Sequence, residues 1–206
     1  MIYFKRMFIN KYNKSKGLFY GNKYLNKKYY LSKMMMFGEM YKKYTVLYLN
    51  NVHEPKSALR LLKKYELKID SDFDKIVDKC WEIYENKNIL TKGYGDYLKK
   101  LYRVKDEDFK LISFGLYRDN DLKAGEYGCI TGNIYHSYCG YHEESSSGTV
   151  QMIKMFRFLK ENGFICCNLG QTLDEYKYKY KFGAVDINRD EYLKLMNLCG
   201  ASPTVP

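Results

Sequence analysis

The sequence predicts a mixed α/β (α+β) fold in which helices pack on a mixed β-sheet. Short runs of β-branched and aromatic residues, typical of strands, alternate with stretches in which apolar residues recur at helical spacing. The second half of the chain has the pattern strand, strand, helix, strand, strand, so a helix crosses between two strands of the sheet. With 206 residues, 46% of them hydrophobic and 29% charged, the chain is long and apolar enough to bury a core.

The first half of the chain contributes both strands and helices. Residues 45–50 are predicted to form a strand, and Pro55 is expected to begin a short helix. Residues 67–72 are expected to end a strand and cap the next helix. Apolar residues at helical spacing then predict helices over 73–85 and 91–104.

The second half supplies the crossover. We expect a strand over 109–117 and one or two strands over 127–139, with Gly125 and Gly128 in the turn between them. A helix follows residues 145–148 and ends at a Gly163 C-cap, and its polar N-cap is a candidate anion site. The remaining elements are expected to be strands over 164–168 and 182–187 and a helix over 191–198.

Positive charge is concentrated at the N-terminus. The net charge is +11, and residues 1–38 hold nine Lys or Arg and no Asp or Glu. Aromatic residues, which make up 17% of the chain, are interleaved with these cations. Lysines contact phosphates and rings stack on exposed bases, so this pattern favours a nucleic-acid partner. We expect tRNA phosphates to contact this segment through five cations: Lys5, Arg6, Lys11, Lys14 and Lys16.

The six cysteines are expected to be free thiols, because no secretory signal is evident and no CxxC pair occurs. His136, Cys139 and His142 form a compact group of potential zinc ligands, but their spacing matches no common zinc motif. On a regular strand the two histidines share a face and Cys139 points away, which favours packing over a metal site. We expect a cytoplasmic monomer that does not bind membranes, since no apolar run of about 18 residues is present.

Several motifs, in a fixed order along the chain, match one protein family. They are Phe73-Asp74-x-Ile76-x-x-x-Cys80, the segment 88–93, Ile112-Ser-Phe-Gly115-Leu-Tyr117, and Gly183-Ala184-x-x-Ile187-x-Arg189-x-x-Tyr192-Leu193. With these motifs, residues 73–197 resemble the leucyl/phenylalanyl-tRNA–protein transferase family, and residues 17–70 look like the N-terminal region of divergent eukaryotic relatives.

The resemblance implies a fold, a reaction and partners. The fold is of the N-acetyltransferase (GNAT) type over residues 69–206, preceded by a small basic N-terminal domain over 1–68. The reaction moves an amino acid from the 3′ end of a charged tRNA to the α-amine at the N-terminus of an acceptor protein, which marks that protein for degradation. Aminoacyl-tRNA is the co-substrate, and no metal or other cofactor is implied.

The strand that forms the family's substrate pocket departs from the bacterial pattern. An ungapped alignment places residues 137–142 on the bacterial Gly-Glu-Ser-Met-Phe-Ser. The expected substrate-binding residues are Ser137, Tyr138, Gly140, Tyr141, Glu143 and Glu144. Gly140 replaces a methionine of the pocket wall, and the two glutamates follow the strand. An opened pocket near carboxylates would accept a cationic side chain such as arginine, whereas the family itself favours leucine or phenylalanine. The alternative is that both acids are solvated.

The family's Asp-x-Gln motif is also altered. Asn168 falls on the aspartate, and Gln171 lies one residue beyond the expected glutamine. These two residues are the predicted catalytic residues. Asn168 cannot accept a proton, so its amide would position a neighbour. In addition, the run 176–181 alternates Tyr and Lys; if extended, it would direct Lys177, Lys179 and Lys181 to one face, where they would contact tRNA.

Two other functions are consistent with the sequence. One is an acyl-CoA N-acetyltransferase of the same fold, although we find no pyrophosphate-binding Arg/Gln-x-x-Gly-x-Gly/Ala loop. The other is a catalytically inactive RNA-binding module, which the loss of the family's Glu and Asp favours.

Overall fold

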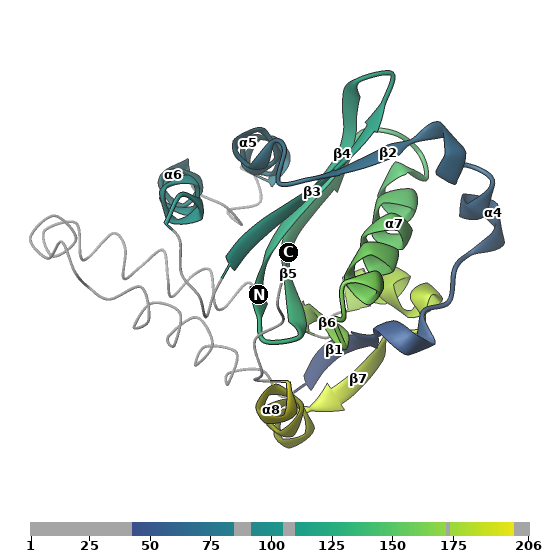
Figure 1. The fold of residues 1–206 in the computed structure, drawn as a ribbon, viewed down its shortest axis with the longest axis vertical. Helices are drawn as coiled ribbons and strands as arrows, with labels where there is room; N and C mark the ends of the chain where they lie inside the picture. The colour runs from purple at the N-terminus through teal and green to yellow at the C-terminus, as the bar shows by residue number, and fades with distance from the viewer. Residues whose placement is uncertain (1–42, 85–91, 105–109, 172–173, 200–206) are drawn as a thin grey trace, which may run out of the picture.

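The computed structural model describes residues 43–84, 92–104, 110–171 and 174–199 (Figure 1). Seven strands form one sheet in the order β2-β3-β4-β5-β6-β1-β7. The strands are β1 (Lys43–Tyr48), β2 (Glu66–Ile69), β3 (Lys110–Arg118), β4 (Asp121–Thr131), β5 (Ile134–His142), β6 (Cys166–Gln171) and β7 (Val185–Asn188). All neighbours are antiparallel except β5 and β6. The mixed sheet predicted from the sequence is confirmed.

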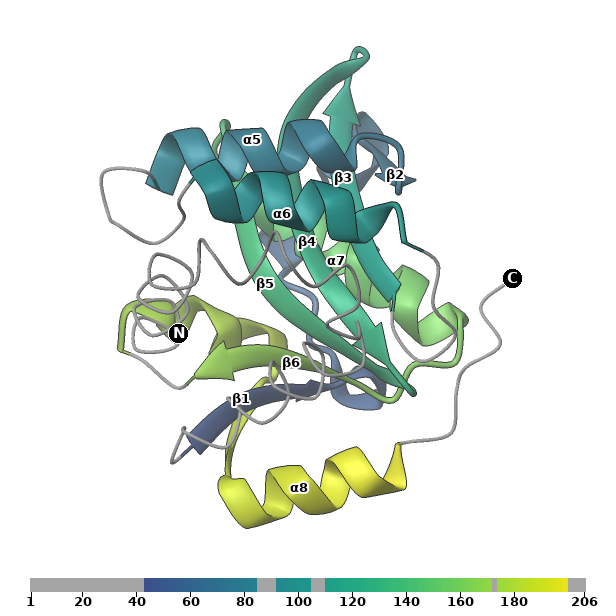
Figure 2. The ribbon, with the colours of Figure 1, turned by 90° about the vertical axis from the view of Figure 1, so that its left-hand side faces the viewer.

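Helices cover both faces of this sheet (Figures 1 and 2). The crossover helix α7 (Ser147–Glu161) packs on one face, and α5 (Phe73–Tyr84) and α6 (Lys92–Tyr102) lie side by side on the other. Helix α8 (Arg189–Leu198) follows β7 and packs on β1. The short helices are α4 (Lys56–Leu59), η2 (Leu49–Asn51), η3 (Leu62–Lys64) and η5 (Asp174–Phe182).

The alternation of side chains along the strands creates separate cores. On β1, Leu47 packs in the core under α7, whereas Tyr44 and Val46 pack in the core under α8. Helix α5 buries Ile76 and Cys80 at helical spacing in a third core, together with residues of α6. Because each strand is covered on both faces at the centre of the sheet, these strands are apolar almost throughout.

The expected domain boundary is not supported by the strand order. Strand β1 lies between β6 and β7, and β2 pairs with β3 at the edge of the same sheet. The boundary between residues 68 and 69 therefore falls inside β2, and β1, on its N-terminal side, lies within the same sheet. The basic residues 1–38 lie outside the described residues.

The turn predicted at Gly125 and Gly128 is wrong, because both glycines lie inside β4. The β3–β4 turn is instead made by Asp119 and Asn120, whose φ angles of 53° and 65° fit a two-residue hairpin turn. Gly125 is required by close packing: a Cβ there would lie 2.9 Å from a side-chain carbon of Ile76 on α5.

Candidate active site where two parallel strands separate

The parallel strands β5 and β6 pair over a short distance and then separate. Three pairs join them, the last of which is His136 with Asn168. Beyond that pair, β5 continues to His142 and β6 to Gln171. We call the region between the separating halves the divergence. The carboxyl ends of parallel strands are where α/β proteins bind ligands, so the divergence is the candidate active site.

A β-bulge in β5 shapes the divergence. The register with β4 shifts between Tyr127, which faces Cys139, and Gly128, which faces Ser137. A Cβ at Gly128 would lie 2.1 Å from the carbonyl oxygen of His136, so only glycine allows this approach. The extra residue reverses the alternation of side chains: His136 is buried whereas His142 is exposed. The expectation that the two histidines share a face is therefore wrong.

On the α7 face of the divergence, a buried carboxylate is surrounded by hydrogen-bond donors. Glu126 of β4 is 6% exposed, and its Oε1 accepts a 3.0 Å hydrogen bond from the hydroxyl of Tyr135. The side chains of Ser137 and Gln151 and the charge of Lys179 also favour the ionised form of this carboxylate. Burial raises the pKa of Glu126, and these donors and the ammonium oppose the rise. The donors therefore favour the ionised carboxylate.

Lys179 reaches the same region from η5. Its side chain is buried, and its ammonium donates to the carbonyl oxygen of Leu169 on β6. Burial lowers the pKa of Lys179 to about 8, against the opposing charges of Glu126 and Asp186. The divergence thus contains one buried acid and one buried amine.

Asn168 lies on the opposite face of the sheet, under α8. Its Nδ2 donates to the Tyr192 hydroxyl at 2.6 Å and lies 3.3 Å from Nδ1 of His136. Its Oδ1 accepts a hydrogen bond from the backbone N–H of Gly170. Because a backbone N–H can only donate, this contact fixes which end of the Asn168 amide is the oxygen. His136 Nε2 then donates to Thr131 Oγ1 at 2.7 Å.

Burial fixes the protonation state of the histidine, and the network fixes the role of the asparagine. Burial lowers the pKa of His136 to about 4, so the ring is neutral at pH 7. The amide of Asn168 is directed to Tyr192 and His136, so it positions these groups at the last β5–β6 pair. Gln171, the second predicted catalytic residue, ends β6, and its side chain lies outside the described residues.

The predicted substrate-binding residues separate into two groups. Ser137 and Gly140 lie with Glu126 on the α7 face: Ser137 favours the charged form of Glu126, and Gly140 pairs with it across the strands. Tyr138 and Tyr141 instead pack toward α5, where Tyr138 lies 2.8 Å from Cys129 Sγ.

The two acids that follow β5 are paired with cations of this chain. Glu144 contacts Arg118 at 2.6 Å and Lys123 at 3.6 Å, and it accepts a hydrogen bond from the Tyr65 hydroxyl. Glu143 lies 3.3 Å from the ammonium of Lys79. Neither contact favours the prediction that these acids receive a cationic substrate.

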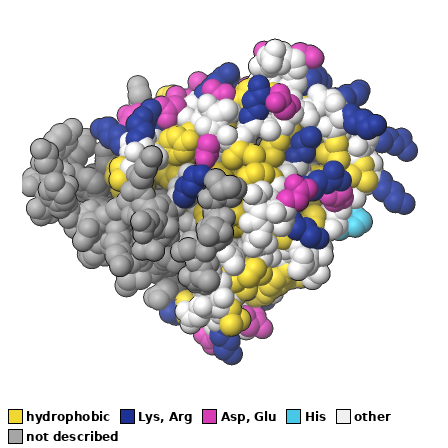
Figure 3. Space-filling view, in the orientation of Figure 1, with side chains coloured by type: hydrophobic (Ala, Val, Ile, Leu, Met, Phe, Trp, Pro, Cys, Tyr) yellow, Lys and Arg dark blue, Asp and Glu magenta, His cyan; other side chains and the backbone are white. Residues whose placement is uncertain are grey.

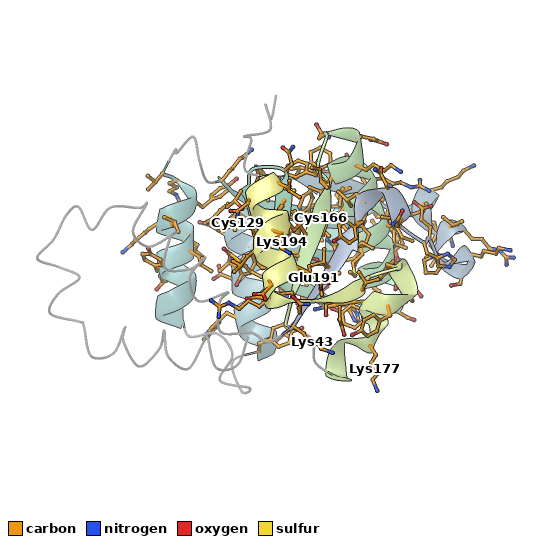
Figure 4. The ribbon with its side chains drawn as sticks, turned by 90° about the horizontal axis from the view of Figure 1, so that it is seen from below. Lys43, Cys129, Cys166, Lys177, Glu191 and Lys194 are labelled. Atoms are coloured by element: carbon orange, nitrogen blue, oxygen red, sulfur yellow. The ribbon has the colours of Figure 1, made fainter. Side chains whose placement is uncertain are left out.

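The tyrosine-lysine run does not form the expected extended segment. It is a 3₁₀ helix, in which residues three apart share a face, so alternate residues diverge. Lys179 is buried, and its predicted contact with tRNA is therefore wrong, whereas Tyr178 and Tyr180 are exposed. Lys177 and Lys181 are exposed, and Figure 4 shows Lys177 projecting from η5. The five predicted N-terminal cations lie outside the described residues.

Two groups of candidate functional residues are not predicted from the sequence. Glu126 and Lys179 were not identified as members of one site, although a single acid inside an apolar strand was a usable signal. The second group is the exposed cations near α4, which gather at one edge of the surface in Figure 3: Lys56, Arg60, Lys63 and Lys64.

Of the described residues, no group of His, Cys, Asp and Glu could hold a metal ion. All six cysteines are buried free thiols, and in Figure 4 α8 lies in front of Cys129 and Cys166. No helix in the described ranges is long and apolar enough to span a membrane.

Comparison with known proteins identifies the family. The model of the leucyl/phenylalanyl-tRNA protein transferase family matches residues 46–197. Transferases of this name from Campylobacter jejuni subsp. doylei and Campylobacter lari are 27% and 25% identical over 153 residues, which cover 73% of this chain and 66% of each relative.

Among solved structures, the chain is similar to L-PGS from Bacillus licheniformis (12% identity, TM-score 0.49, covering 78% of this chain and 66% of that chain). It is also similar to a GCN5-related N-acetyltransferase from Kribbella flavida (10% identity, TM-score 0.39, covering 79% and 54%). The chain spans about two thirds of the length of its curated relatives, and the match of the family model to most of its length shows that it belongs to the leucyl/phenylalanyl-tRNA protein transferase family.

Proposed function

We propose that this protein transfers an aminoacyl group from charged tRNA to the α-amine at the N-terminus of an acceptor protein. The observation that carries this proposal is the family match over residues 46–197, which includes every strand that forms the divergence. The proposal includes the arginyl, leucyl and phenylalanyl groups as candidates. We further propose that the enzyme is a cytoplasmic monomer and that its product is marked for degradation.

The chemistry requires little beyond positioning. The acceptor nitrogen forms an amide bond with the carbonyl carbon of the aminoacyl group, and the ester bond to the 3′-terminal ribose breaks. The proton of the amine passes to the ribose oxygen that leaves. The ester is already activated, so holding the amine in line supplies several kcal/mol of the barrier. Backbone N–H groups of β5, where β6 no longer pairs with it, are suited to stabilise the oxyanion.

The test is a transfer assay with the full chain. Purified protein receives tRNA charged with labelled arginine, leucine or phenylalanine, together with a peptide that has a free N-terminus. We expect label to enter the peptide from at least one charged tRNA. The same peptide with an acetylated N-terminus is the control, and it should remain unlabelled because its α-nitrogen is no longer nucleophilic.

The same assay separates the two alternative functions. Acetyl transfer from acetyl-CoA to the peptide, with no transfer from any charged tRNA, would identify an acyl-CoA enzyme. Binding of tRNA without any transfer would identify an inactive RNA-binding module. Either result would overturn the proposed function.

A further inference from the structure

Glu126 lies next to a position that has no side chain. It pairs directly with Gly140 across β4 and β5. A Cβ built on Gly140 would lie 3.3 Å from the carbonyl oxygen of Gly125 and 3.4 Å from the Cβ and Cγ of Glu126, and Gly140 is partly exposed. Residue 140 lies beyond the last β5–β6 pair, so this space and the carboxylate border the divergence.

The surroundings of Glu126 do not explain it as a packing residue. The residue of β3 that pairs with Glu126 is Phe114, and helix α7, which covers this face of the sheet, contributes apolar side chains. A buried carboxylate in such a place is costly unless it is paired and hydrogen-bonded. The polar groups that act on it are the Tyr135 hydroxyl, which donates to it, and the side chains of Ser137 and Gln151, which favour its charged form. Tyr135, Ser137, Gln151 and the charge of Lys179 thus stabilise the ionised form of Glu126 against the effect of burial, which raises its pKa.

We propose that Glu126 selects the amino acid that is transferred, by pairing with a cationic side chain of the aminoacyl group in the space that Gly140 leaves. This inference rests on the proposed function. A guanidinium fits best, because its planar fork donates two parallel hydrogen bonds to one carboxylate. Arginine is therefore the expected side chain, selected through Glu126 rather than through Glu143 or Glu144.

Lys179 is the buried positive charge that acts on Glu126. Its ammonium bonds to the Leu169 carbonyl and faces two carboxylates, those of Glu126 and Asp186. A second cation beside Glu126 would repel this ammonium. Since the pKa of Lys179 is already lowered to about 8, its ammonium loses a proton readily when a guanidinium binds beside Glu126. Binding of an arginyl group should therefore release a proton, and it should be tighter at pH 8.5 than at pH 7.

The experiment compares wild type with Glu126→Gln, which keeps the shape of the side chain and removes its charge. Transfer from arginyl-, lysyl-, leucyl- and phenylalanyl-tRNA is measured on one acceptor peptide. We expect wild type to prefer arginyl-tRNA, and Glu126→Gln to lower kcat/KM for arginyl-tRNA about 10- to 100-fold. Asp121→Asn is the matched control, because Asp121 is an exposed acid at the start of the same strand; it should leave that value within about 2-fold.

A second variant keeps the charge and fills the space. Gly140→Met should lower arginyl transfer while Glu126 remains, and the backbone at Gly140 has no positive φ that would strain the substitution. Binding of a 3′-amide-linked arginyl-adenosine to wild type and variants provides a readout independent of turnover, and its tightening with pH should disappear in Lys179→Met.

The outcomes separate this inference from the proposed function. If wild type transfers leucine or phenylalanine but neither arginine nor lysine, the proposed function stands and the role of Glu126 is overturned. It is also overturned if Glu126→Gln folds and leaves the arginyl-to-leucyl ratio unchanged, or if Glu143→Gln lowers that ratio instead. Absence of transfer from every charged tRNA overturns both.

Discussion

Single residues at the divergence show how burial sets protonation on the two faces of one sheet. His136, under α8, is held neutral, and its two ring nitrogens are occupied by Asn168 and Thr131. Glu126, on the opposite face, is surrounded by donors that favour its charge. The residues on the α8 face therefore hold β5 and β6 in place. The α7 face carries Glu126, the charged group that we assign to substrate selection.

The buried histidine should make stability depend on pH. Its pKa is lowered to about 4, whereas an unfolded histidine titrates near 6.5, so the unfolded chain binds more protons between these values. The contribution of His136 to the free energy of unfolding is complete above pH 6.5. It is lost as the pH falls to 4, by roughly 3 kcal/mol. Urea unfolding of wild type and His136→Gln from pH 7 to 4 measures this difference.

The comparison isolates His136 because other titrating groups contribute equally to both proteins. We expect the stability advantage of wild type to shrink steadily below pH 6.5. A difference that stays constant across this range would show that burial does not suppress protonation of the ring.

Among the elements, the bulged β5 decides the geometry of the site. Gly128→Ala places a methyl group where the His136 carbonyl lies, so β5 must move or lose pairing with β4. We expect a loss of stability of at least about 2 kcal/mol. Gly95→Ala is the control, because among the described residues a Cβ there meets only a Val77 methyl, at 3.4 Å, and alanine favours helix α6. Thermal unfolding of both variants tests this; equal melting temperatures would contradict it.

The sequence was sufficient for the elements whose patterns are local. The helices at 73–84 and 147–161 follow from apolar spacing, and the strands at 43–48 and 110–118 from their composition. The predicted position of the β3–β4 turn is wrong because two glycines are a stronger local turn signal than Asp119-Asn120. Those glycines serve contacts between segments far apart in sequence, to Ile76 and to His136, which no local pattern reveals.

The site was harder to predict because it depends on the same distant contacts. Asn168 was identified as important, but its partner Tyr192 is 24 residues away. The bulge beside His136 depends on cross-strand register, and Lys179 is buried within a 3₁₀ helix rather than in the extended segment that its alternating pattern suggests.

The 3₁₀ helix η5 also separates two roles for its lysines. Lys177 and Lys181 are exposed, whereas Lys179 is buried beside the divergence. Lys177→Gln with Lys181→Gln should weaken tRNA binding, reduce the slope of log K against log salt by about 1 to 2, and leave the melting temperature within about 2 °C. Filter binding across a salt series measures the slope. A fall in melting temperature with an unchanged slope would assign these lysines a structural role.

For the whole molecule, the distribution of charge determines how tRNA is expected to bind. Nine of the 35 basic residues precede Glu39, and the rest of the chain is nearly neutral, with 26 basic and 24 acidic residues. Most of the long-range attraction to a polyanion therefore comes from the N-terminal segment, and the exposed cations near α4 and η5 add local contacts.

Neutralising the N-terminal cations should change the salt dependence of tRNA binding more than the choice of the amino acid that is transferred. With Lys5, Arg6, Lys11, Lys14 and Lys16 all replaced by Gln, the slope of log K against log salt should fall by up to about 4, because each released counterion contributes about 0.7 to 0.9. The ratio of arginyl to leucyl transfer should not change, since that choice is made at Glu126, within the sheet. Replacing the exposed cations near α4 instead is the matched comparison. If the N-terminal replacements leave the slope unchanged while those near α4 reduce it, tRNA binds along the edge of the sheet domain and the N-terminal cations are a solvated segment.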